Sequence, residues 1–214
     1  MTLRNAVPWV AGLFLAASTA LAMTGPSTPP PPPPTSQPGI PGMSSSGNAQ
    51  PTARQEAEQS YALAYEEVGK AKKDLEEGKT KNAEKKFRRA LERCEKAVSF
   101  DERYHEAWNL LGFTARKTGD YDKAFKAYER CLTIKPDYAP AREYLGEAWL
   151  EKGDAVKARA QLLWLERLEA VEEAKTLRSA LDAWAAVHPD STGAPAASPS
   201  RADSGAVGAG TSGN

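Results

Sequence analysis

The sequence predicts an all-α protein: a solenoid of about three helix-turn-helix repeats plus a C-terminal capping helix, with disordered tails. Three observations lead to this fold class. Residues 53–187 hold nearly all the charged residues and almost no proline. Apolar residues in this segment recur at spacings of three and four, which is the period of an amphipathic helix. The segment also contains an internal repeat with a period of 34 residues, as stacked helix pairs do.

The repeat is clearest between residues 105–138 and residues 139–169. A Leu-Gly pair, a Gly-Asp pair and a small residue recur in the second copy 34 residues after their places in the first. The matched positions are Leu111 with Leu145, Gly112 with Gly146, Gly119 with Gly153, Asp120 with Asp154, and Ala124 with Ala158. Two copies of one helix pair are therefore expected to stack on each other.

Each copy predicts two helices joined by a tight turn, and the four helices are expected over 105–117, 121–133, 139–151 and 155–167. Gly119 can take a positive φ in the turn, and Asp120 can cap the helix that follows. Pro136 ends the second helix because it has no N–H to donate to the preceding turn. The residues expected to face inward are Trp108, Leu111, Gly112, Ala115, Ala124, Tyr128, Cys131, Leu145, Gly146, Trp149, Ala158, Leu162 and Leu165.

A degenerate earlier copy, residues 64–104, precedes these two. Its Gly78 and Ala83 lie 41 residues before Gly119 and Ala124, and the seven additional residues amount to about two helical turns. A long second helix is therefore expected over about 81–100. Its partner helix is predicted from an apolar stripe made of Tyr61, Tyr65, Val68, Ala71 and Leu75.

A closing helix is expected over residues 170–187. The last repeat of a solenoid exposes an apolar edge, which an amphipathic helix can cover. The apolar face of this helix consists of Val171, Ala174, Leu177, Leu181 and Trp184.

The repeat resembles the tetratricopeptide repeat (TPR) family. The resemblance is carried by Trp108, Leu111, Gly112, Gly119, Ala124, Tyr128 and Pro136. The chain is also similar to small exported bacterial proteins of this family, through residues 111–113 and 141–147. The resemblance covers residues 61–187 and implies an open right-handed superhelix that acts without catalysis, by holding another protein or peptide in a concave groove. A repeat of this kind specifies the fold more than the function.

The resemblance also implies which side chains face the groove: Glu106, Asn109, Phe113, Arg116, Glu143, Glu147 and Leu150. The family's clamp for a C-terminal carboxylate uses Lys, Asn and Arg, but here Glu143 and Glu147 lie opposite Asn109 and Arg116. A free carboxylate would be repelled, so a segment with Lys or Arg beside an apolar side chain fits better. Phe113 has two interpretations, as a groove residue or as packing between first helices.

The first 22 residues are typical of an export signal. Arg4 precedes an apolar stretch over residues 10–17, and Ala20-Leu21-Ala22 supplies the small residues that a signal peptidase requires. We therefore expect an exported, periplasmic protein. The alternative is an uncleaved helix that tethers the chain to the inner membrane. No cysteine follows the apolar stretch, which argues against a lipid anchor.

Two further segments lack the composition of a folded domain. Residues 23–52 include six consecutive prolines and predict a disordered linker with a stiff polyproline rod. Residues 188–214 are rich in Pro, Ser, Gly and Ala and predict a disordered tail.

The composition argues against several classes of function. Lys and Arg number 28 and so do Asp and Glu, so no overall charge favours nucleic acid. Two histidines and two cysteines offer little for a metal centre, and neither His105 nor His188 has a partner that would make it a general base. Glutamates interleave with the basic run over 79–93, which favours a solvated helix face over phosphate or membrane binding. The sequence therefore predicts no catalytic, cofactor-binding or metal-binding residue.

Some alternatives stay open. Cys94 and Cys131 could form a disulfide in an oxidising compartment, although Cys131 occupies a small-residue core position. The protein could be an assembly factor for an envelope secretion or pilus machine, a membrane-anchored scaffold, or an accessory to an enzyme. The expected partner is a protein or peptide whose identity the sequence does not specify.

Overall fold

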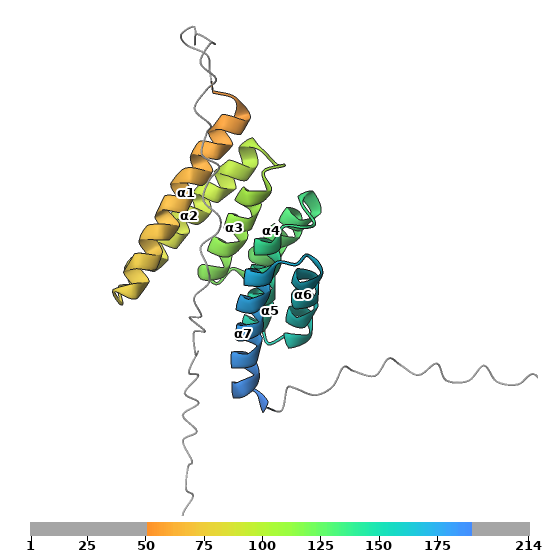
Figure 1. The fold of residues 1–214 in the computed structure, drawn as a ribbon. Coiled ribbons are helices and arrows are strands. Elements are labelled where there is room, and N and C mark those ends of the chain that lie inside the picture. Colours follow the sequence, from red (N-terminus) through yellow and green to blue (C-terminus); the bar gives the residue numbers. More distant parts are fainter. Residues whose placement is uncertain (1–50, 190–214) are drawn as a thin grey trace, which may run out of the picture.

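Seven helices and no strand make up residues 51–189, the part of the chain that the computed structural model describes (Figure 1). The expected export signal, most of the proline-rich linker and nearly all of the C-terminal tail lie outside these residues. The helices are α1 (Ala53–Glu76), α2 (Thr80–Phe100), α3 (His105–Lys117), α4 (Tyr121–Ile134), α5 (Ala139–Glu151), α6 (Ala155–Arg167) and α7 (Val171–Val187). The predictions for α3, α5 and α6 are confirmed at both ends, and those for α2, α4 and α7 are correct to within one residue.

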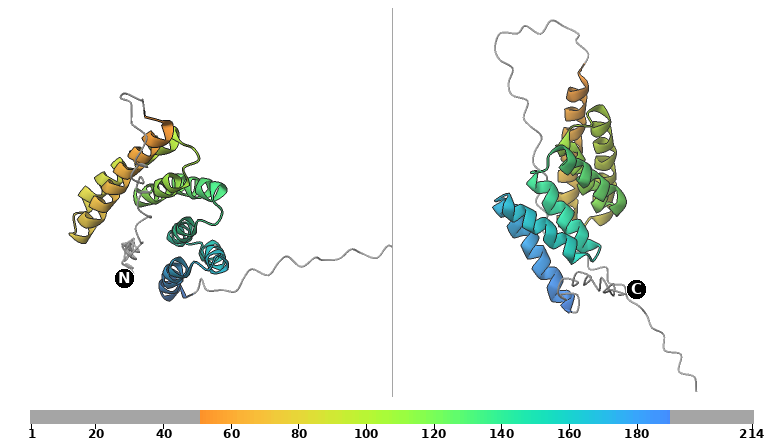
Figure 2. Two further views of the ribbon diagram at one scale, coloured as in Figure 1. Left: turned by 45° about the horizontal axis from the view of Figure 1, so that its top comes forward. Right: turned by 90° about the vertical axis from the view of Figure 1, so that its right-hand side faces the viewer.

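The helices form successive antiparallel pairs that stack into a curved solenoid (Figure 2). Along the described chain, the backbones of the first helices α1, α3, α5 and of the closing helix α7 each approach the next closely, whereas those of the second helices α2, α4 and α6 do not approach one another. The first helices therefore line the inner side of the curve and the second helices lie on its outer side. None of these seven helices is long and apolar enough to cross a bilayer.

Glycine and aspartate shape the turns as the sequence predicts. Gly78, Gly119 and Gly153 adopt φ values of 72°, 84° and 81°, a region that costs other residues energy. The carboxylates of Asp120 and Asp154 each accept a hydrogen bond of 3.0 Å from the backbone N–H three residues later. These two N-caps explain why α4 and α6 begin where they do.

Two helical glycines allow helices to approach closely. A Cβ atom on Gly112 would lie 2.6 Å from Cε1 of Tyr128 in α4, and one on Gly146 would lie 2.5 Å from Cδ2 of Leu177 in α7. Neither distance is compatible with ordinary packing. The closing helix α7 therefore packs closely against α5 because Gly146 has no side chain.

The apolar stripe predicted for α1 is correct only in part. Tyr61, Val68 and Ala71 are buried, but Tyr65 is half-buried and Leu75 is 41% exposed. The buried face of α1 consists of Ala57, Tyr61, Ala64, Val68, Ala71 and Asp74. Asp74 takes the place expected for its apolar neighbour because Lys86 of α2 pairs with it at 2.6 Å.

Other inward positions are mostly as expected. Val171 is 69% exposed, because it is the first residue of α7 and has no neighbouring turn to cover it, while the rest of the predicted face of α7 is buried. Trp108, Trp149 and Leu162 are half-buried. Cys94 and Cys131 are buried free thiols, so the structure contains no disulfide between them.

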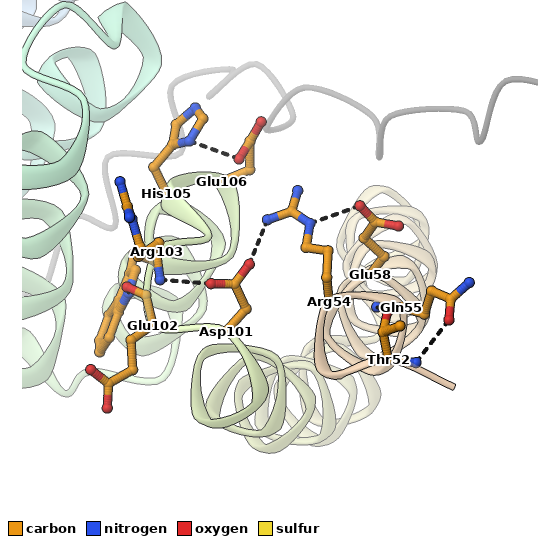
Figure 3. Close-up of polar contacts among 10 residues, drawn as sticks. Thr52, Arg54, Gln55, Glu58, Asp101, Glu102, Arg103, His105 and Glu106 are labelled. Atoms are coloured by element: carbon orange, nitrogen blue, oxygen red, sulfur yellow. Dashed lines mark hydrogen bonds and ion pairs between the residues drawn. The ribbon is translucent and has the colours of Figure 1, made fainter. Parts of the chain in front are cut away.

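Polar contacts fix the start of α1 against the rest of the solenoid (Figure 3). Thr52 and Gln55 cap α1 reciprocally, and the guanidinium of Arg54 donates to Glu58 and to Asp101, each at 2.8 Å. Asp101 lies in the loop between α2 and α3 and also accepts from the backbone of Arg103 at 2.9 Å. The hydrogen bond from Arg54 is the main reason that the pKa of Asp101 is lowered.

Candidate functional site

The inner side of α3 and α5 brings together the side chains that the resemblance assigns to a groove. Six of them are buried and Glu106 is half-buried. The buried positions are Asn109, Phe113, Arg116, Glu143, Glu147 and Leu150. Their place on neighbouring first helices agrees with the repeat register, and their contact with a partner stays a prediction.

A buried ion-pair network occupies the middle of this face. Arg116 of α3 donates to Glu147 at 2.7 Å and to Glu151 at 2.8 Å, both on α5, and only 1% of the Arg116 side chain is exposed. Tyr121 of α4 also donates to Glu151, at 3.1 Å. Sequence reasoning missed Glu151, although its position one turn after Glu147 was a signal that it points the same way.

The electrostatics of Arg116 follow from this network. Burial alone would lower the pKa of its guanidinium, but Glu147, Tyr128 and Glu151 outweigh burial and raise that pKa. The charge of Arg116 is therefore compensated within the chain. A partner carboxylate would have to compete with two glutamates for this side chain.

Two lysines that sequence reasoning did not assign to the groove lie near this network. Burial, together with the charge of the neighbouring Arg116, lowers the pKa of Lys117 to about 8. Burial also lowers the pKa of Lys72 of α1, while Glu76 and Glu147 oppose that effect. Lys117 follows Arg116 directly in the sequence, but no sequence signal placed Lys72, because the register of α1 was not fixed by a clear repeat.

The opposite end of the inner face carries buried polar groups without protein partners. Within residues 51–189, neither atom of the Asn109 side-chain amide has a hydrogen-bond partner, nor do the hydroxyls of Tyr104 and Tyr138 or Nε2 of His105. Each unsatisfied buried group costs about 1–3 kcal/mol. Because these groups are buried within the chain, their missing hydrogen bonds are a local cost to folding at this end of the face.

Glu106 supplies the charge at that end. Its carboxylate lies 2.9 Å from Nδ1 of His105, so His105 has a carboxylate partner that the sequence did not predict. Burial lowers the pKa of His105, so the imidazole is neutral at pH 7. The neutral ring can donate a hydrogen bond to Glu106 without cancelling its negative charge. The inner face thus has an acidic side chain, Glu106, at the end near Asn109, and two cationic side chains, Lys117 and Lys72, at the other end.

Phe113, which had two interpretations, is fully buried between its neighbours. Its ring centroid lies 6.2 Å from that of Phe87 and 5.5 Å from that of Tyr144. These contacts join α2, α3 and α5. Phe113 therefore packs between the helices and holds the middle of the inner face in shape.

The described residues offer no clear centre for other chemistry. In the ordered helices and their turns, no three His, Cys, Asp or Glu side chains gather as metal ligands. Burial raises the pKa of both Cys94 and Cys131, so neither thiol is activated as a nucleophile.

Comparisons with known proteins identify the repeat. The family model described as Tetratricopeptide repeat matches residues 105–138, which form α3 and α4. Protein FlbA of Caulobacter vibrioides is 39% identical over 51 residues, and the match covers 24% of this chain and 9% of FlbA. Among solved structures, the chain is similar to MamA with a TM-score of 0.32 and 18% identity, over 63% of this chain and 89% of MamA.

The matched segment is the copy in which the Leu-Gly and Gly-Asp pairs were found, and the structure repeats its helix pair in α5 and α6. Because the family model and the internal repeat coincide on α3 and α4, residues 105–138 form a tetratricopeptide repeat.

Proposed function

We propose that this protein is a non-enzymatic scaffold of the bacterial cell envelope that holds an extended segment of a partner protein along the inner face of its first helices. Tetratricopeptide repeats are protein-interaction modules, which supports a protein or peptide partner. The envelope setting is supported by the signal-like residues 1–22, in which a basic start and an apolar stretch precede Ala20-Leu21-Ala22.

The observation that carries the inner-face proposal is the buried amide of Asn109, whose oxygen and nitrogen both lack a hydrogen-bond partner among the described residues. A side-chain amide can accept from a backbone N–H and donate to a backbone C=O at the same time. An extended peptide presents both groups side by side, and its sequence does not matter for this contact. Because the Asn109 side chain is fully buried, the partner's main chain would reach this amide only if neighbouring side chains move aside.

The charges of the face suggest the side chains of that partner. Glu106 favours a Lys or Arg near Asn109, while Lys117 and Lys72 favour an Asp or Glu toward the other end. Because Arg116 already contacts Glu147 and Glu151, its positive charge is compensated within the chain and does not attract an acidic partner residue to the middle of the face. The matching segment thus carries a basic residue at one end and an acidic residue at the other.

Site-specific photo-crosslinking in the native envelope tests this proposal. A photoreactive residue in place of Glu106 is expected to capture the partner, whereas the same residue in place of Glu129, on an exposed part of α4, is not. In the protein with the photoreactive residue at position 106, Asn109→Leu keeps the branched shape and the number of non-hydrogen side-chain atoms but removes the amide, so the adduct should be lost while the melting temperature holds. Equal adducts from both positions, or an adduct that survives Asn109→Leu, would contradict an inner-face site.

The envelope setting has a separate test. Fractionation of cells is expected to place the protein in the periplasm, with a mature N-terminus at residue 23. An intact N-terminus in the membrane fraction would instead support the tethered alternative. Recovery in the cytoplasm would contradict an envelope role.

A further inference from the structure

A hollow of about 660 Å³ lies on the outer side of the solenoid, between α2 and α4. Its apolar lining comes from Val98 of α2, Trp108 and Leu111 of α3, and Ala127 of α4. Lys123 of α4 pairs with Glu95 of α2 at 2.7 Å across its edge. We call this hollow the outer crevice. It is separate from the inner face, which belongs to the opposite side of α3.

The next repeat contains the equivalent crevice, but there it is filled by the protein itself. Thirty-four residues after Trp108 stands Arg142, and thirty-four after Arg130 stands Trp164, so the aromatic and the guanidinium have exchanged places. Arg142 lies over the Trp164 ring, with its guanidinium carbon 4.3 Å from the ring centroid. Gln161, in the place of Ala127, accepts a hydrogen bond of 3.3 Å from Arg142.

Both crevices fix the side chain from the first helix in the same way. Nε1 of Trp108 donates to the carbonyl of Glu102 at 2.9 Å, and Nη2 of Arg142 donates to the carbonyl of Pro136 at 2.7 Å, which is the same carbonyl one repeat later. Trp108 is therefore held in the orientation of Arg142. Arg130 does not cover the Trp108 ring as its counterpart would, and approaches the Glu102 carboxylate at 4.0 Å instead.

The rim of the outer crevice has a defined charge pattern. Glu95 and Asp120 both contact Lys123, whereas Lys126 forms no ion pair with any residue in 51–189 and Arg130 forms only the long contact to Glu102. Lys126 and Arg130 lie one turn apart on α4 and are exposed. Asp122 keeps the start of α4 acidic. The part of the rim that Lys126 and Arg130 form is therefore the part that attracts a carboxylate.

We propose that the outer crevice binds a segment of another protein that places an aromatic side chain on Trp108 and a neighbouring carboxylate against Lys126 and Arg130. In the filled crevice of the next repeat, the Trp164 ring stacks against Arg142, the side chain that the first helix contributes. This arrangement indicates that an aromatic ring fits against Trp108, which occupies the place of Arg142 in the outer crevice. Trp108 is fixed in advance by its hydrogen bond, so little side-chain entropy is lost when a ring stacks on it. Arg130 is placed to cover the incoming ring by a cation–π contact.

The location can be tested with the full chain labelled with 5-fluorotryptophan and the peptide acetyl-Ser-Phe-Asp-Ser-amide. Addition of the peptide is expected to shift the fluorine signal of Trp108 and to leave those of Trp149, Trp164 and Trp184 in place. Replacing Phe by Ala, or Asp by Lys, in the peptide should weaken binding about tenfold or more. Absence of a Trp108 shift, or equal binding of all three peptides, would overturn the proposal.

A variant that copies the filled crevice gives the sharpest test. Trp108→Arg combined with Arg130→Trp transfers the arrangement of Arg142 and Trp164 into the outer crevice, so the repeat should still fold. Its affinity for the fluorescein-labelled peptide, measured by anisotropy, is expected to fall about tenfold or more. Trp164→Ala is the matched control and should leave the affinity unchanged.

Two further outcomes would also count against the proposal. A Trp108 signal that shifts with protein concentration in the absence of peptide would indicate that a second copy of this chain fills the crevice. A folded exchange variant, with an unchanged circular-dichroism spectrum, that still binds the peptide as tightly as the wild type would show that the peptide binds elsewhere. Loss of inner-face crosslinking from the Glu106 position affects neither result, so the two sites can be judged separately.

Discussion

The guanidinium of Arg116 donates to Glu147 at 2.7 Å, and this contact joins the inner sides of α3 and α5. The Glu147 side chain is 10% exposed, so the pair is almost fully removed from water. Neighbouring repeats in a solenoid depend on each other's packing, and a buried pair at this junction fixes one repeat against the next. Charge reversal at Glu147 would place two cations together and would test folding rather than partner binding.

We predict that Arg116→Met lowers the free energy of unfolding by about 3 kcal/mol, because it removes the cation from two glutamates in a buried setting. Glu147→Gln should cost less, since Glu151 stays in contact with Arg116. Urea denaturation followed by circular dichroism measures both. Arg54→Met is the control: its partners Glu58 and Asp101 lie at the surface, so its loss should cost about 1 kcal/mol or less. Equal effects of the Arg116 and Arg54 variants would contradict this account.

The helical glycines give a second prediction. Gly112→Ala should lower the free energy of unfolding by about 1–2 kcal/mol, because the new methyl group would overlap the rigid Tyr128 ring. Gly146→Ala should cost less, since the methyl groups of Leu177 can rotate away. Gly69→Ala, in the middle of α1 with nothing within 4 Å, should instead stabilise the protein by about 1 kcal/mol. Thermal melting of the three variants should show this order, and a destabilised Gly69 variant would refute it.

Most helix limits could be predicted because residues that form turns and helix caps determine them locally. Gly119 and Gly153 occupy the turns with positive φ, and Asp120 and Asp154 cap the helices that follow. The stripe of α1 was harder. Its copy of the repeat is degenerate, so no second copy fixed its register, and Leu75 was placed inside where Asp74 is buried.

The candidate site could be predicted by position but not by environment. The repeat register placed Arg116 and Glu147 on neighbouring first helices, and they do meet there. It could not show that Phe113 would be buried between Phe87 and Tyr144, because α2 contributes one of those rings. The sequence shows that tryptophan and arginine exchange places between the two repeats, at 108 and 142 and at 130 and 164. It does not show that the outer crevice is open, because that depends on how these side chains are oriented.

Lys117 predicts a pH dependence of stability. Its folded pKa of about 8 lies below the ordinary value for lysine, about 10.4, so the folded state binds fewer protons than the unfolded state between these values. Stability from this group therefore rises as the pH increases from about 8 to 10.4. Lys117→Met should be more stable than the wild type by about 1–2 kcal/mol at pH 7, and the difference should shrink toward pH 10.

Urea titrations of both proteins at pH 7 and pH 10 measure this change. Lys126→Met, on the exposed rim of the outer crevice, is the control and should show no such trend. A Lys117→Met variant whose advantage is the same at both pH values would show that the lysine is not buried as a cation.

The turn before α7 lacks both devices that form the turns before α4 and α6. Glu169 adopts a positive φ of 55° where those turns have glycine. Ala170 occupies the N-cap with φ −80° and ψ 77°, close to the −86° and 77° of Asp120, but has no side chain that could cap α7.

Ala170→Asp should therefore stabilise the protein by about 1 kcal/mol, and Glu169→Gly by about 0.5–1 kcal/mol. Asp154→Ala, the reverse change at an equivalent turn, should destabilise it by about 1 kcal/mol. Melting temperatures of the three variants measure these effects. If Asp154→Ala lowers the melting temperature while Ala170→Asp leaves it unchanged, the last turn is not limited by its missing cap.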